Sequence, residues 1–69
     1  MSNGIETHAR TLAAAVREHR IVRNLTQIEA AAELRVSLRT FQAWESGRTF
    51  PQPSHRRVIA SWLIDEDAA

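Results

Sequence analysis

Apolar residues recur at helical spacing in the first third of the chain. They are Ile5, Ala9, Leu12, Ala13 and Val16. Because three- and four-residue steps place side chains on one side of an α-helix, the pattern predicts a helix from Ile5 to about Arg23. Asn24 tolerates the left-handed backbone conformation and is expected to end this helix.

Two shorter helices are predicted in the middle of the chain. Thr26 and Glu29 have the spacing of a capping box, in which each side chain satisfies a backbone N–H of the other, so a helix should cover residues 27–34. Its three consecutive alanines, 30–32, favour helix and let a neighbouring helix approach closely. Ser37 is placed as the N-cap of a further helix from Leu38 to about Ser46, which Gly47 should close.

A loop and a last helix complete the pattern. Residues 48–53 contain two prolines and predict a loop. The apolar residues beyond it predict a helix from Ser54 to about Ile64: Val58, Ile59, Trp62 and Leu63. The acidic residues 65–67 follow at the negative end of its dipole, where a helix should fray. The chain is therefore expected to be one all-α domain, 1–69, with a core of about 5–64 and flexible ends at 1–4 and 65–69.

The two middle helices define the arrangement of the domain. Only about three residues separate them, too few for side-by-side packing, so they must cross steeply, as in a helix-turn-helix. Ala31 stands where a larger side chain would collide with the second helix. Five further residues are expected to face inward at this crossing: Ala30, Leu34, Val36, Phe41 and Trp44.

Composition narrows the class of protein. With 69 residues, 43% hydrophobic and 25% charged, the chain suits one small globular domain. It has no cysteine, which fits a reducing cytoplasm and excludes thiolate metal sites. Neither a secretory signal nor a membrane-spanning run is expected.

Charge is unevenly distributed. Residues 1–57 hold nine arginines and five glutamates, a surplus of four positive charges, whereas residues 58–69 hold three acidic residues. Every basic residue is Arg, whose planar donors suit phosphate and guanine, although codon bias explains the same count equally well. The basic body indicates an anionic partner.

Three motifs stand together between residues 26 and 63. They are Thr26-Gln27-x-Glu29-x-Ala31-x-x-Leu34-x-Val36-Ser37, Trp44-Glu45-x-Gly47-Arg48-x-x-Pro51 and Ile59-Ala60-x-x-Leu63. In combination they resemble the Cro/C1-type (XRE) helix-turn-helix family of repressors. The resemblance implies a lambda-repressor-like domain of four helices, with five as the alternative. Arg35 departs from the family by replacing the usual turn glycine, which costs roughly 1 kcal/mol if the turn is left-handed.

The resemblance assigns the helix that begins at Leu38 to the major groove of DNA. Expected base contacts are Leu38, Arg39, Thr40, Gln42 and Ala43. Arg39 is the first choice for reading guanine through two hydrogen bonds, with contact to phosphate or solvent alone as the alternative. Gln42 is expected to read adenine or to point to solvent.

A second set of residues is expected to hold phosphates, partly at helix N-termini. They are Thr26, Gln27, Ser37, Ser46 and Arg48. For Thr26, a plain capping role is the alternative. The family also implies an ion pair between Arg20 and Glu45, which we interpret as structural.

The sequence shows no set of residues typical of an enzyme active site. His8 and His19 would lie roughly 16 Å apart along one helix, too far to share a metal ion, and His55 stands alone. The three histidines are expected on the surface. There is no phosphate-binding glycine loop and no nucleophile beside a base. We expect no metal, no cofactor and no small-molecule ligand.

The sequence therefore predicts a transcriptional regulator, most simply a repressor, that binds a palindromic operator in double-stranded DNA as a homodimer. Candidate dimer contacts are Phe50, Trp62 and Ile64. Such a protein would control its own operon in a phage or another mobile element, including operons of the anti-CRISPR-associated type. The alternatives are an antitoxin and a helix-turn-helix that binds only proteins.

Overall fold

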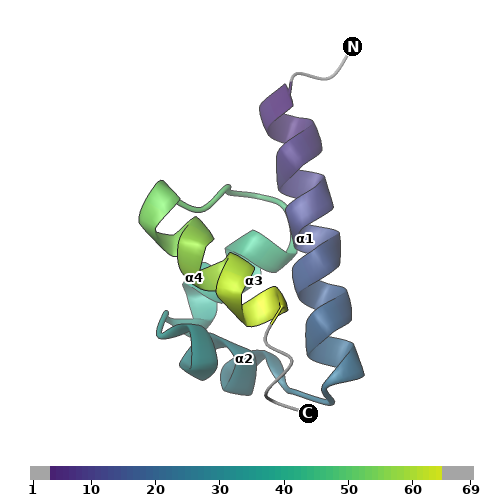
Figure 1. The fold of residues 1–69 in the computed structure, drawn as a ribbon, viewed down its shortest axis with the longest axis vertical. Coiled ribbons are helices and arrows are strands. Elements are labelled where there is room, and N and C mark those ends of the chain that lie inside the picture. Colours follow the sequence, from purple (N-terminus) through teal and green to yellow (C-terminus); the bar gives the residue numbers. More distant parts are fainter. Residues whose placement is uncertain (1–3, 65–69) are drawn as a thin grey trace.

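The computed structural model describes residues 4–64, with side chains from His8 onward. This part of the chain contains four α-helices and no strand, which confirms the all-α prediction. The helices are α1 (Gly4–Val22), α2 (Gln27–Leu34), α3 (Leu38–Glu45) and α4 (Pro53–Leu63) (Figure 1). Gly4, expected in a flexible end, already belongs to α1. The predictions for residues 1–3 and 65–69, and for the side chain of Ile5, lie outside the described part.

The long helix α1 runs along one side of the molecule, and the three shorter helices cluster beside it (Figure 1). α3 packs against both α1 and α2, and α4 packs against the same two helices. None of the four helices combines the length and the apolar character needed to cross a bilayer.

Side chains near the start of α2 and α3 determine where these helices begin. The Thr26 hydroxyl accepts a hydrogen bond from the Glu29 N–H at 3.0 Å, and the Glu29 carboxylate accepts one from the Thr26 N–H at 2.8 Å. The Ser37 hydroxyl accepts from the Thr40 N–H at 3.1 Å. These contacts satisfy N–H groups that have no partner inside the helix, so both predicted caps are confirmed.

Two non-glycine residues adopt the left-handed conformation after helices. Asn24 follows α1 with φ 58°, and Arg35 follows α2 with φ 59°. The turn at Arg35 lets the Val36 N–H donate to the Ala31 carbonyl at 3.0 Å. Both expectations from the sequence are confirmed, and Arg35 carries the steric strain of a Cβ atom in this region.

The core draws on all four helices. Its members are Ala9, Ala13, Val16, Ala30, Ala31, Leu34, Phe41, Trp44, Ile59 and Trp62. Val16, Phe41 and Ile59 are the largest fully buried side chains. Ala30 and Ala31 are buried in α2, which packs against α3. Val36 is half-buried and packs against this core. The set expected to face inward at the crossing is thus confirmed, with Val36 at the margin of the core.

The position of Trp62 contradicts one prediction from the sequence. It was expected to contact a second subunit, but it belongs to the core of this chain, with only 7% of its surface exposed. The indole N–H donates to the Glu33 carboxylate at 2.8 Å, and the ring meets His19 edge-on at 4.5 Å. Because α4 turns this side chain toward α1 and α2, the indole N–H and the indole ring each have a partner within this chain.

Relief of the strain at Arg35 offers a direct test of the turn. We expect Arg35→Gly to raise the free energy of unfolding by about 0.5–1 kcal/mol, because glycine adopts the left-handed region without a Cβ penalty. Urea denaturation followed by circular dichroism measures the change. Arg35→Ala is the control, since it removes the same exposed side chain but keeps the Cβ atom. An equal gain in both variants would show that the side chain, not the backbone, is responsible.

Candidate nucleic-acid interface

Helix α3 has one buried side and one outer side. Phe41 and Trp44 are buried and fix the rotation of the helix about its axis. Arg39 and Gln42 are exposed, and the remaining predicted base contacts, Leu38, Thr40 and Ala43, are half-buried. The structure therefore places all five predicted base contacts on or beside the outer side of α3.

One carboxylate joins three helices beside this surface. Glu45, at the end of α3, accepts from the Arg20 Nε of α1 at 2.7 Å and from the Gln27 Nε2 of α2 at 2.7 Å. The side chains of Arg20 and Glu45 are only 17% and 7% exposed. Arg20 also donates to the Leu25 carbonyl at 2.9 Å, which ties the α1–α2 turn to the same group. The predicted ion pair is confirmed, and its role in holding α3 in place is structural.

A pair of glutamines continues this network onto the outer surface. Gln42 Nε2 of α3 donates to Gln27 Oε1 of α2 at 3.0 Å. Gln27 is held in turn by Glu45, so the amide of Gln42 is oriented by a chain of hydrogen bonds from the protein interior. An oriented amide presents one donor and one acceptor, which is the pattern that pairs with adenine. The sequence predicted a DNA contact for each glutamine and gave no sign that the two bind each other.

The hydroxyl groups expected to hold phosphate already have partners inside the protein. Ser37 donates to the Thr40 hydroxyl at 3.0 Å, and Ser46 donates to the Ala43 carbonyl at 3.1 Å. The Thr26 hydroxyl accepts the capping bond from Glu29, which is the alternative expected for this residue. In this group of hydroxyls, capping is therefore what the structure shows, and phosphate contact stays a prediction.

The charged residues of α2, of α3 and of the two turns that follow them divide into two groups. Every carboxylate is engaged: Glu29 in the capping box, Glu33 with Arg23 and Trp62, and Glu45 with Arg20 and Gln27. The exposed guanidinium groups of three arginines have no carboxylate or other hydrogen-bond partner in residues 8–64: Arg35, Arg39 and Arg48. Uncompensated positive charge thus lies on and beside α3.

Glu33 anchors a second cluster, which was not visible in the sequence. Its carboxylate accepts two bonds from Arg23, at 2.7 and 3.2 Å, and one from the Trp62 indole. These contacts, Arg23 first and Trp62 second, hold the pKa of Glu33 below its usual value. The cluster joins the end of α1 to α2 and α4. No spacing rule could have found it, because its members are far apart in the sequence.

The histidines were expected on the surface, and the structure places one of the three there and two in half-buried positions. His19 is half-buried against Trp62, and His55 is half-buried against Trp44 at 5.4 Å between ring centroids. Within the described residues, no three His, Asp or Glu side chains gather closely enough to hold a metal ion.

Comparison of the chain with family models, with curated proteins and with solved structures gives no match. The motifs of the sequence and the geometry of α2 and α3 are therefore the observations that bear on function.

Removal of the shared carboxylate tests the network. We expect Glu45→Ala to lower the free energy of unfolding by about 3 kcal/mol, because it leaves the Arg20 guanidinium poorly solvated and without its partner. The control is Arg23→Ala, which breaks a more exposed pair and should cost less than about 1 kcal/mol. Urea denaturation of both variants gives the comparison. Similar losses in the two would contradict a special role for Glu45.

The lowered pKa of Glu33 predicts a dependence of stability on pH. The ion pair stabilises the fold above the ordinary carboxyl pKa of about 4.5, and this contribution is lost as the pH falls through the lowered pKa of the folded state. Glu33→Gln keeps an acceptor for Trp62 but removes the charge. We expect the wild type to be more stable than this variant at pH 7, by less than about 1 kcal/mol because the pair is exposed to solvent. The difference should vanish in strong acid; a difference that persists there would exclude the charge as its cause.

Proposed function

We propose that the protein is a cytoplasmic, sequence-specific DNA-binding regulator of the Cro/C1 type, most simply a repressor, in which α3 is the recognition helix. The observation that carries this proposal is the division of charge around α2 and α3. Every carboxylate there is satisfied within the protein, whereas Arg35, Arg39 and Arg48 are unpaired and exposed. Such a surface attracts the phosphate backbone and leaves guanidinium groups available to DNA.

The geometry of α3 supports direct reading of bases. A major groove admits one α-helix, and specificity comes from side chains whose positions are fixed before binding. Arg39 makes no hydrogen bond within the described residues that DNA binding would have to break, and it offers two parallel donors to guanine. Gln42 is oriented by Gln27 and offers the complementary pattern for adenine. The half-buried Leu38 and Ala43 suit the methyl group of thymine.

Phosphate contacts are proposed on both sides of this helix. Arg48 follows α3 and is exposed, so its guanidinium can contact the phosphate backbone of DNA at one side of the helix. At the other side, the first turn of α2 has backbone N–H groups that no residue within the helix accepts, and such groups attract anions. Gln27 stands in this turn and is half-buried.

A homodimer on an inverted repeat is part of the proposal. With two-fold symmetry, two recognition helices would lie about 34 Å apart, one turn of DNA. Trp62 no longer qualifies as a dimer contact. Of the two other candidates, Ile64 is 74% exposed at the end of α4, and Phe50 is half-buried in the loop before α4.

Selection of the purified protein on random double-stranded DNA tests the function. Enrichment of a two-fold symmetric motif at moderate salt is the expected result. Binding without enrichment, lost steeply as salt rises, would indicate contact with phosphate only. No binding at all would favour a helix-turn-helix whose partner is a protein.

Arg39 and Arg48 should differ in what they contribute to DNA binding. On the selected site, we expect Arg39→Ala to lose about tenfold or more in affinity, corresponding to roughly 1–3 kcal/mol, and to relax one position in each half-site. Arg48→Ala is the matched contrast, because it removes the same charge from a proposed phosphate contact. It should weaken all sequences alike and reduce the salt dependence by about one counterion per half-site. Uniform weakening by both variants would contradict the reading of a base by Arg39.

A further inference from the structure

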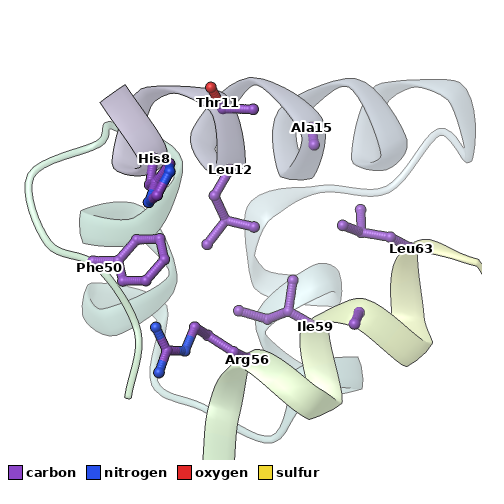
Figure 2. Close-up of a pocket in the computed structure, with 9 residues that line it drawn as sticks. His8, Thr11, Leu12, Ala15, Phe50, Arg56, Ile59 and Leu63 are labelled. Carbon is purple, nitrogen blue, oxygen red and sulfur yellow. The ribbon is translucent and has the colours of Figure 1, made fainter. Parts of the chain in front are cut away.

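A groove of about 330 Å³ lies between α1 and α4, and none of the candidate DNA contacts lines it. Figure 2 shows Leu12 of α1 and Ile59 and Leu63 of α4 lining it, with Phe50 at one end. Ala15 and Ala60 complete the apolar lining and leave the space open, because neither side chain extends beyond Cβ. This volume is at the lower end of the roughly 300–1,000 Å³ typical of small-molecule pockets.

A single cationic side chain stands at the end of the groove. The guanidinium of Arg56 lies over the Phe50 ring, 5.1 Å from its centroid (Figure 2). A cation–π contact of this kind uses none of the guanidinium N–H groups in a hydrogen bond, so these donors stay available. No carboxylate or other acceptor in residues 8–64 binds Arg56, and none of the described residues that line the groove is acidic.

We propose that this groove binds a small carboxylate with an apolar chain or ring. The apolar body would lie between Leu12, Ile59 and Leu63, and the carboxylate would accept two hydrogen bonds from Arg56. Charge complementarity favours an anion, because the described lining contains Arg56 and no acidic side chain. The proposal does not rest on the proposed DNA binding, but it assigns Phe50 to the groove, so the proposed homodimer would form through other contacts, such as Ile64. Nothing in the sequence pattern indicates the groove.

The size and shape of the groove argue for a small molecule over a protein partner. Phe50 and Arg56 close one end of its apolar part, and the two helices form the sides (Figure 2). Beyond Ala15 and Leu63 the surface continues into a hollow that the polar side chains of Glu18 and His19 line together with Val22. A partner helix would need a longer apolar surface, with anchors about one turn apart along its length. A molecule with one ring and a short acidic tail fills the groove and places its charge at the closed end.

Titration of the full chain with 4-phenylbutyrate, followed by amide chemical shifts, tests the proposal. We expect saturable shifts at Leu12, Ala15, Phe50, Ala60 and Leu63 at millimolar ligand. The amine of the same carbon skeleton, 4-phenylbutylamine, should bind at least about tenfold more weakly, since it removes one charge-assisted contact and adds repulsion. Equal binding of acid and amine, or no saturable shift, would overturn the proposal.

Two variants with one matched control locate the site. Arg56→Gln should weaken the acid about tenfold, whereas Arg57→Gln, which removes the neighbouring charge outside the groove lining, should leave its affinity unchanged. Ala60→Leu fills the groove from an exposed position and should abolish binding. Circular dichroism establishes that each variant is folded, and retained binding in folded Ala60→Leu contradicts the site. Amide shifts of the groove residues could also change with protein concentration when no ligand is present. That result would show that a second copy of the chain covers the groove, and it too would overturn the proposal.

Discussion

The carboxylate of Glu45 is the contact on which the arrangement of the helices depends. Glu45 is the last residue of α3, and its carboxylate accepts hydrogen bonds from Arg20 of α1 and from Gln27 of α2. One group thus fixes three helices relative to one another. A charge that is only 7% exposed is tolerated only when it is paired. The apolar core of such a short chain is small, so a polar contact of this kind adds to the side-chain packing that holds its helices together.

The same contacts determine the charge that the protein presents to a partner. The net charge of the chain is only +1, which by itself indicates little. Folding places the glutamates of α2 and α3 against the protein's own donors and leaves Arg35, Arg39 and Arg48 exposed. A nearly neutral chain thereby acquires a positive surface around α3. The network through Glu45 and Gln27 also orients Gln42, so the same contacts serve both stability and the proposed reading of bases.

The two proposed sites use different helices but share one connection. The candidate DNA interface is built on α2 and α3, and the groove is built on α1 and α4. Residues 46–52 join α3 to α4 and contribute Arg48 to the first site and Phe50 to the second. This separation lets each site be tested without the other, because the variants proposed for the groove leave the outer side of α3 unchanged.

The sequence by itself determined the local structure. The caps at Thr26 and Ser37 and the left-handed turn at Arg35 follow from hydrogen bonds and steric limits within a few residues, so their spacing was sufficient to predict them. The partner of Arg20 was predicted only through a family resemblance. Only the tertiary structure decided that Trp62 lies in the core, that the two glutamines bind each other and that a groove opens beside Phe50. These features depend on how helices cross, and crossing is set by the packing of side chains far apart in the sequence.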